Sequence, residues 1–231
     1  MIGKLNYLEK STRPDIAYAV HQCACFCSTP KRSHRDAVHL IGRYLLGTAE
    51  KGLIMHPTNE SFDCYVDASH TGKWNRENAK EDETSAKSRS GYVITYGNCP
   101  ILWASKMQTE IALSSTEAEY IALSQSLREI IPLTALIQEA KTFGINITSN
   151  QAKLHCKLFE DNTGAAELAK VPKMRPRMKH LNIKYHHFRK HVSDGLVSIH
   201  TVTTEQQIAD IFTKPLNQSL FAQHRKRILG W

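Results

Sequence analysis

The 231-residue sequence has no long hydrophobic run and no export signal. No stretch approaches the ~20 consecutive apolar residues that a membrane-spanning helix needs. Residues 1–7 contain no apolar core of the kind found in secretory signals. Internal repeats and low-complexity tracts are also absent. We therefore expect an intracellular protein without a membrane partner, folded as one large domain or as a domain with an appendage.

Cysteine and histidine motifs of the kind that bind zinc are missing. The six cysteines contain no Cys-x-x-Cys pair, and the twelve histidines contain no His-Glu-x-x-His spacing. An intracellular setting also disfavours disulfides. We therefore expect the cysteines to be small buried apolar side chains. They are Cys23, Cys25 and Cys27, which alternate within an expected helix, and the scattered Cys64, Cys99 and Cys156.

Acidic residues are scarce in the last quarter of the chain. Residues 170–231 contain 12 Lys and Arg against 3 Asp and Glu, a net charge of +9. Residues 1–169 contain 18 against 19, a net charge of −1, so the whole excess of +8 lies near the C-terminal end. This asymmetry favours a polyanionic partner, and a well-solvated basic face is the alternative.

The first part of the chain is expected to be helical. Pro14 suits the start of a helix over 15–27, and Pro30 breaks that helix. Apolar residues then recur on one face over 34–46, and Gly47 ends the second helix. No catalytic pattern occurs in this part of the sequence.

Beyond residue 52 the pattern changes to short strands and then to alternating strands and helices. A Gly-Asn-Cys-Pro turn between 91–96 and 101–104 indicates a hairpin, and the polar stretch 71–88 indicates an exposed loop. This order predicts an α/β fold with a mixed sheet. The other expected strands are 53–55, 62–67, 153–160 and 196–201, with a short run at 110–113 that extends or follows the hairpin. The expected helices are 115–142, interrupted near Pro132, and 163–169, 181–193, 205–214 and 218–229.

Four acidic residues occupy comparable places in this pattern. Asp67 and Asp161 each close an apolar run, Glu119 lies early in the long helix, and Asp210 lies within a later helical pattern. Carboxylates in such places can converge on one edge of a sheet, where they repel one another unless cations occupy the site. Two metal ions about 3.5–4 Å apart on shared carboxylates are usual for phosphodiester cleavage. Taken singly, each acid has the ordinary alternative of a turn, cap or helix-dipole residue.

This order of elements, with an acid at each place, resembles ribonuclease H. The match is closer to the ribonuclease H domain of copia-type LTR-retrotransposon Pol polyproteins, in the segments 65–68, 88–93, 113–120, 160–162, 179–186 and 209–216. The resemblance implies a ribonuclease H-like, mixed five-stranded sheet flanked by helices over 60–216. It also implies a helical connection segment from the reverse transcriptase over 1–55, and a C-terminal helix or tail over 217–231. The polymerase signature Tyr-x-Asp-Asp is absent, so the chain resembles a C-terminal fragment of the polyprotein.

The resemblance also implies roles for the acids. Asp67 corresponds to the aspartate that bridges two metal ions, and Asp161 and Asp210 correspond to the other two aspartates. Glu119 precedes the apolar-x-Ala run that follows the family's glutamate, whereas Glu117 is about 200° away on the helix and would face elsewhere. The implied activity is hydrolysis of the RNA strand of an RNA–DNA hybrid with two Mg²⁺ ions, for which Mn²⁺ can substitute. Retroviral-type integrases would need a glutamate near 192–199, where none occurs.

Further residues are candidates for binding the hybrid. Polar residues at the start of the long helix and after Asp161 are suited to contact the 2′-OH that distinguishes RNA from DNA, with helix capping as the alternative; they are Ser114, Ser115, Thr116 and Asn162. A basic group in the last quarter is expected to hold phosphates without reading sequence, and it includes Lys179, His180 and Arg189.

The expected partners are the RNA–DNA hybrid and the polymerase domain of the same polyprotein, and the expected location is a cytoplasmic virus-like particle or the nucleus. Two other interpretations stay open, namely a catalytically inactive nucleic-acid-binding module and a fragment that only docks on a polymerase. A His-bearing loop found in many cellular ribonucleases H is missing, because only residues 202–204 separate Thr201 from Glu205. His200 is therefore expected to lie in a strand.

Overall fold

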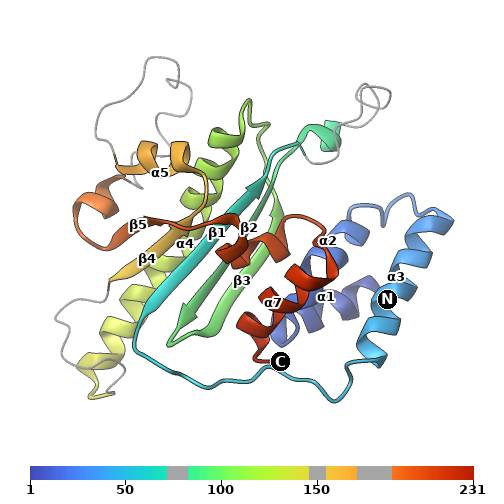
Figure 1. Cartoon of the computed structure of the whole chain (residues 1–231), viewed down its shortest axis with the longest axis horizontal. Helices are drawn as coiled ribbons and strands as arrows, with labels where there is room; N and C mark the ends of the chain where they lie inside the picture. The colour runs from blue at the N-terminus through green and yellow to red at the C-terminus, as the bar shows by residue number, and fades with distance from the viewer. Residues whose placement is uncertain (72–82, 146–154, 171–188) are drawn as a thin grey trace.

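The computed structural model describes residues 1–71, 83–145, 155–170 and 189–231, and a five-stranded sheet forms its centre (Figure 1). The strand order is β3-β2-β1-β4-β5, with β1, β2 and β3 antiparallel and β1, β4 and β5 parallel. This is the ribonuclease H-like mixed sheet that the sequence predicts. The strands are β1 (Phe62–Ser69), β2 (Arg89–Tyr96), β3 (Cys99–Met107), β4 (Cys156–Glu160) and β5 (Val197–Thr201).

Side-chain alternation along the strands separates two cores on the two faces of the sheet. On one face, Cys64 and Val66 of β1 and Leu158 of β4 pack in the cluster formed with α4 (Ser115–Thr142) and α5 (Thr163–Lys170). On the other face, Val93 of β2 packs with Phe212 in the cluster formed by α2 (Ala17–Ala24), the 3₁₀ turn η5 (Ile208–Phe212) and α7 (Gln218–Leu229). Asp67 alternates with Val66, so it faces the η5 side.

The hairpin between β2 and β3 forms as expected. Gly97 and Asn98 have φ values of 60° and 69°. Two successive residues with positive φ make the type of two-residue turn whose twist matches antiparallel strands. A side chain at Gly97 would also meet the carbonyl oxygen of Asn59 at 2.6 Å, so glycine is required there for two reasons.

The N-terminal helices pack against the sheet through α2. They comprise α1 (Ile2–Ser11), η1 (Pro14–Ile16), α2 and α3 (Arg32–Leu46), and they share a small core of Leu5, Ile16, Val20 and Ile41. Trp103 of β3 donates a hydrogen bond from Nε1 to the carbonyl oxygen of Glu9, 2.8 Å away. Figure 1 shows these helices beside α7 at the β3 side of the sheet.

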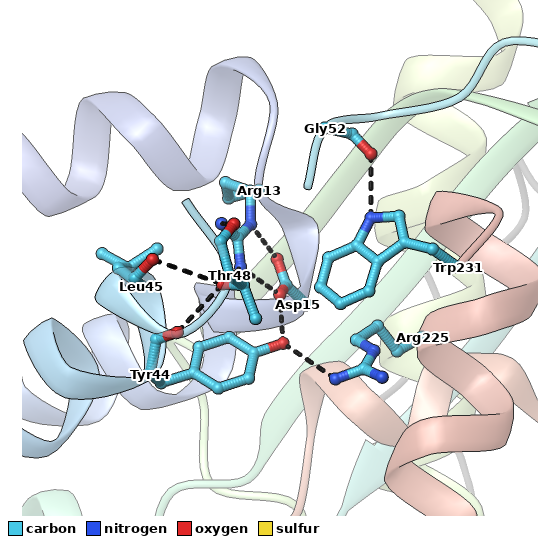
Figure 2. Close-up of polar contacts among 8 residues, drawn as sticks. All are labelled: Arg13, Asp15, Tyr44, Leu45, Thr48, Gly52, Arg225 and Trp231. Atoms are coloured by element: carbon cyan, nitrogen blue, oxygen red, sulfur yellow. Dashed lines mark hydrogen bonds and ion pairs between the residues drawn. The ribbon is translucent and has the colours of Figure 1, made fainter. Parts of the chain in front are cut away.

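A polar cluster joins the N-terminal helices to the C-terminal end of the chain (Figure 2). Arg13 and Asp15 form a buried ion pair with an N–O distance of 2.9 Å, and the Tyr44 hydroxyl donates to Asp15 at 2.6 Å. Arg225 of α7 lies over the Trp231 ring, 4.2 Å from its centroid, and approaches the Tyr44 hydroxyl at 3.5 Å. Burial and Asp15 raise the pKa of Tyr44 to about 12, so this hydroxyl stays a donor at neutral pH.

Most expected strands and helices are present with bounds that differ by a few residues, but four expectations are wrong. Residues 53–55 form no strand, because Ile54 donates its N–H to Leu229 at the end of α7 and not to the sheet. Residues 110–113 are irregular. Pro132 does not interrupt α4, since burial of Ile130 and Thr134 holds the helix on the sheet on both sides of it.

The fourth wrong expectation is the helix over 205–214. The chain forms two short 3₁₀ turns there, η4 (Thr204–Gln206) and η5. Gln207 separates them because its side-chain amide donates to the carbonyl oxygens of Val66 and Phe159, at 2.8 and 3.2 Å. This buried side chain bridges β1 and β4, and its backbone conformation, with ψ of 89°, ends the helical pattern.

Two further expectations have mixed outcomes. Cys64, Cys99 and Cys156 are buried, but Cys25 and Cys27 are exposed where α2 ends, which contradicts the prediction that they are core residues. The expected strand and helix residues 153–154 and 181–188 lie outside the described residues. In the part of the chain that the structure describes, no helix has the length and hydropathy needed to cross a membrane.

Candidate metal site

The site opens where β1 and β4 separate. Their parallel pairing ends at Tyr65 and Phe159. At this point the Gln207 side-chain amide donates hydrogen bonds to the carbonyl oxygens of Val66 and Phe159. Asp67 lies two residues past the last paired position of β1, and Asp161 follows the last residue of β4. The divergence of the strands therefore leaves space for both carboxylates at one edge of the sheet.

A glycine in β2 brings η5 onto Asp67. Asp67 pairs with Gly91 across the sheet, and a Cβ atom at Gly91 would meet side-chain atoms of Thr213 at 2.6 Å and of Phe212 at 2.7 Å. Only glycine leaves room for this approach. As a result, the Thr213 hydroxyl donates a hydrogen bond to Asp67 Oδ2, and Asp210 comes beside Asp67.

Glu119 reaches the site from α4, whose start is fixed by two caps. Ser114 accepts the N–H of Glu117 at 3.1 Å, and Glu117 in turn accepts the N–H of Leu113 at 2.9 Å. The Glu117 carboxylate is thus turned back toward the start of the helix. Glu119 is 5% exposed, and one of its oxygens accepts the backbone N–H of Ala68.

Three of the four acids singled out in the sequence meet closely. Asp67, Glu119 and Asp161 each offer a carboxylate oxygen, and these atoms lie within 4.8 Å of one another. Asp161 also accepts a hydrogen bond from the Thr204 hydroxyl at 3.1 Å, which ties it to η4. Three convergent carboxylates fit a hard divalent cation, which prefers oxygen ligands. The group could therefore hold a metal ion.

Asp210 stands beside this group and is joined to it by a lysine. Lys214 Nζ lies 2.9 Å from Asp210 Oδ1 and 3.8 Å from Asp67 Oδ1. Its ammonium is therefore a cation shared by two carboxylates, next to the three-acid group. Asp67 takes part in both arrangements.

The crowding of buried acids shifts their pKa values upward. Burial raises the pKa of Asp67, although Lys214 and Thr213 oppose the shift. Burial and then the charges of Glu160, Asp67 and Asp161 raise the pKa of Glu119 well above its ordinary value. Burial and Asp67 raise the pKa of Asp210 to about 7. Such shifts are expected where carboxylates share a site without enough positive charge.

Two charged residues of the site were not recognised in the sequence. Lys214 lies one turn after Asp210, but its proximity to Asp67 depends on how η5 packs against β2. Glu160 is fully buried beside Asp161, and burial raises its pKa well above the usual value. The alternation of Cys156, Leu158 and Glu160 toward the α4 face was the signal that could have identified it.

Two of the four candidate residues for contact with the 2′-OH are helix caps. Ser114 is the N-cap of α4, and Asn162 accepts the N–H of Ala165 at 3.0 Å as a cap of α5. A Cβ atom at Gly164 would lie 3.2 Å from both Thr116 Oγ1 and Asn162 Oδ1. Thr116 and Asn162 therefore both flank Gly164, and Asn162 directly follows Asp161, whereas Ser115 is exposed on the first turn of α4.

The candidate phosphate-binding residues cannot be placed together. Lys179 and His180 lie outside the described residues. Arg189 is half-buried, donates from Nη2 to the carbonyl oxygen of Leu168 at 3.4 Å, and interacts with the Tyr120 hydroxyl. Its guanidinium is thus engaged within the fold between α4 and α5.

The fold and the acidic site define a ribonuclease H-like domain, and the comparisons give its family. No protein-family model matches the chain. Over 229 residues it is 35% identical to the retrovirus-related Pol polyprotein from transposon RE1 of Arabidopsis thaliana, covering 99% of this chain and 14% of that protein. It is 33% identical over 220 residues to the Pol polyprotein from transposon TNT 1-94 of Nicotiana tabacum, covering 95% and 15%.

A solved structure is also similar in outline. The N-terminal ribonuclease H domain of a Mycobacterium tuberculosis protein matches with a TM-score of 0.44 and 10% identity, over 73% of this chain and 98% of that one. The sequence relatives establish that the chain belongs to the retrovirus-related Pol polyproteins of copia-type transposons. It spans 14% of the length of the RE1 polyprotein.

Proposed function

We propose that the chain hydrolyses the RNA strand of RNA–DNA hybrids during retrotransposon reverse transcription, with two Mg²⁺ ions, or Mn²⁺ in their place. The observation that carries the proposal is the approach of Asp67, Glu119 and Asp161 oxygens to within 4.8 Å of one another. A second cation position is supported by the Lys214 ammonium, which Asp67 and Asp210 share. Asp67 belongs to both positions, as a bridging carboxylate requires.

The four acidic residues would bind the two ions at the reacting phosphate. Glu119 and Asp161 would hold one ion, Asp210 the other, and Asp67 both. Bound ions supply acidity to an attacking water and stabilise the leaving 3′ oxygen. Thr213 fixes the orientation of Asp67 through its hydrogen bond to Oδ2, and Lys214 would leave the Asp67–Asp210 pair when that position is filled. The expected products carry a 5′ phosphate and a 3′ hydroxyl.

Selection of RNA over DNA would come from polar groups beside the acids. Thr116 and Asn162 both lie beside Gly164, at the starts of α4 and α5. A hydroxyl and an amide at this place can donate to and accept from a 2′-OH, which DNA lacks. Ser114 and Ser115 precede Thr116 at the same end of α4. The basic C-terminal quarter, including Lys179 and His180, would hold phosphates, whereas the Arg189 guanidinium is engaged with Leu168 and Tyr120 within the fold.

The family of the chain supports a proposal for its protein partner. The relatives are much longer Pol polyproteins, and this chain spans only a small part of each. We therefore propose that the polymerase portion of such a polyprotein is a partner, that residues 1–55 connect to it, and that the reaction takes place in a cytoplasmic virus-like particle or the nucleus.

A cleavage assay on a labelled RNA–DNA hybrid tests the proposed function. We expect Mg²⁺- or Mn²⁺-dependent cutting of hybrid RNA and no cutting of single-stranded RNA. Asp67→Asn should lower the rate by roughly 100-fold or more, because an amide cannot supply the bridging charge. Asp63→Asn is the matched control, since Asp63 lies on the same strand and accepts from Ser61 away from the acids. Full activity of Asp67→Asn, or equal activity in EDTA, would contradict the proposal.

A further inference from the structure

Gln207 is a fully buried, uncharged side chain whose hydrogen bonds all go to backbone groups beside the metal site. Its relative exposure is 0%. Nε2 donates to the carbonyl oxygens of Val66 and Phe159, at 2.8 and 3.2 Å, and Oε1 accepts the N–H of Ala209 at 3.3 Å. The amide therefore joins three segments of the chain that lie far apart in the sequence.

Two of these contacts fix how far β1 and β4 separate. Val66 directly precedes Asp67, and Phe159 lies two residues before Asp161. Backbone pairing of the two strands ends at this level, so the strands could diverge freely beyond it. Because one nitrogen donates to both carbonyl oxygens, it holds the two strands at a set separation. The spacing of the Asp67 and Asp161 carboxylates depends on that separation.

The third contact sets the place of the remaining aspartate. Gln207 is the N-cap of η5, and its side-chain oxygen accepts the N–H of Ala209, the residue before Asp210. The first turn of η5 is therefore tied to the same amide that holds the strands. This connection places Asp210 where it shares Lys214 with Asp67.

Glutamine is the side chain that these contacts require. Among uncharged side chains, only asparagine and glutamine combine two N–H donors with an acceptor oxygen, and asparagine is one methylene shorter. A buried carbonyl or N–H group left without a partner is costly, so loss of the amide would force the three segments to move. A neutral amide also adds no further negative charge beside the acids.

We propose that Gln207 is a positioning residue of the metal site, which holds Asp67, Asp161 and Asp210 at the spacing that divalent cations require. It acts through the backbone next to each acid and does not itself contact an ion. This inference rests on the proposed function for the presence of the ions. Its consequence is that metal affinity depends on a hydrogen-bonding group that is not a ligand.

Binding of Mn²⁺ to the full chain without nucleic acid tests the proposal, with free Mn²⁺ measured by electron paramagnetic resonance. Gln207→Met keeps the length of the side chain and removes its hydrogen bonds. We expect it to weaken Mn²⁺ binding by about 10- to 100-fold, the range found when groups that orient metal ligands are removed. A merely structural role would lower the stability in urea and leave the Mn²⁺ affinity of the folded protein unchanged.

Thr95→Val is the matched control. Thr95 is also buried, and its hydroxyl donates to a carbonyl oxygen of β1, that of Asp63, four residues before Asp67. Its replacement removes a buried side-chain donor to the same strand, away from the acids. We expect Thr95→Val to lower the stability in urea and to leave Mn²⁺ binding unchanged.

The outcomes separate the alternatives. Unchanged Mn²⁺ affinity in folded Gln207→Met would overturn the proposal. An equal loss in Thr95→Val would overturn it too, because any weakening of the sheet would then disturb the site. If the methionine variant does not fold, Gln207→Asn supplies the test. Its shorter amide cannot reach both strands, so weaker Mn²⁺ binding is expected and unchanged binding would overturn the proposal.

Hybrid cleavage gives a second readout and separates this inference from the proposed function. Gln207→Met should need more Mg²⁺ for half-maximal cleavage, whereas KM for the hybrid should not change, because the amide is buried away from the substrate. An unchanged Mg²⁺ requirement would contradict the positioning role. If the unchanged chain binds Mn²⁺ but does not cleave the hybrid, the proposed function fails, and the Mn²⁺ affinities of the variants still decide the role of Gln207.

Discussion

Lys214 is the residue whose charge allows Asp67 and Asp210 to coexist without metal. Its Nζ lies 2.9 Å from Asp210 and 3.8 Å from Asp67, and its side chain is 38% exposed. We expect Lys214→Met to destabilise the metal-free protein at pH 8 by about 1–2 kcal/mol, a value below that of a fully buried pair because solvent screens the ammonium. Thermal unfolding in EDTA should show a melting temperature about 2–8 °C lower.

Added Mg²⁺ should close most of this difference. A divalent ion replaces the lost positive charge, so wild type and variant should converge at millimolar Mg²⁺. Lys226→Met is a suitable control, because Lys226 carries the same charge on α7. An equal deficit with and without Mg²⁺ would show that Lys214 contributes through packing and not through charge.

His224 is a second residue whose ionisation is coupled to folding. It is fully buried in α7, and neither ring nitrogen has a hydrogen-bond partner among the described residues. Burial, then the charges of Arg227 and Lys214, lower its pKa to about 4. The unfolded chain, with an ordinary histidine pKa of about 6.5, therefore takes up the proton first. Stability present above about pH 6.5 is lost as the pH falls toward 4.

The expected contribution of His224 to this loss is on the order of 3 kcal/mol. Urea unfolding at several pH values would measure it as the difference between wild type and His224→Leu. The carboxyl groups titrate in both proteins, so their effect cancels in that difference. If the difference between wild type and His224→Leu stays constant from pH 7 to pH 4, His224 takes up its proton as readily in the native state as in the unfolded chain, and the prediction is wrong.

Among the elements, η5 depends on the absence of a side chain at Gly91. A Cβ atom there would lie 2.6 Å from Thr213 and 2.7 Å from Phe212. We expect Gly91→Ala to cost about 1–3 kcal/mol through overpacking, and to weaken metal binding because η5 carries Asp210. Gly42→Ala is the control, since a Cβ at this α3 position meets nothing within 4 Å and should stabilise the helix by up to about 1 kcal/mol. Urea unfolding of both variants tests the pair; stabilisation at Gly91 would disprove the close approach.

The same element shows what local sequence can and cannot predict. Asp67 and Glu119 were recognisable because strand alternation and a serine cap fix their places within a few residues. The helix expected over 205–214 was wrong because the Gln207 side chain donates hydrogen bonds to β1 and β4. Val66, one of its partners, is 141 positions away in the sequence, so local sequence does not reveal the contact. Lys214 was missed for the same reason, because its nearness to Asp67 arises only when η5 packs against β2. Glu160 was missed although the alternation along β4 places it on the buried face.

At the scale of the whole molecule, the N-terminal helices help to hold the elements of the metal site in place. Ala17 of α2 packs in one cluster with Ala209 and Phe212 of η5 and with Leu229 of α7. Trp231 closes this arrangement by donating from Nε1 to the carbonyl oxygen of Gly52 at 2.8 Å (Figure 2). The element that carries Asp210 is therefore held between the sheet, the start of the chain and its end.

Asp15 is the residue on which this long-range support can be tested. It accepts from Arg13 and Tyr44, and the Arg13 and Asp15 side chains are 6% and 0% exposed. Asp15→Ala would leave a buried guanidinium without its carboxylate, and we expect a loss of about 3–5 kcal/mol in urea unfolding. Hydrogen exchange should accelerate in α3 and α7 before it does in β1 or β4, because Tyr44 of α3 connects Asp15 with Arg225 of α7. Asp36→Ala breaks an ion pair whose Arg35 and Asp36 side chains are 63% and 60% exposed, and it should change stability by less than about 1 kcal/mol. Equal effects of the two substitutions would mean that the buried cluster does not hold the N-terminal helices to the rest of the chain.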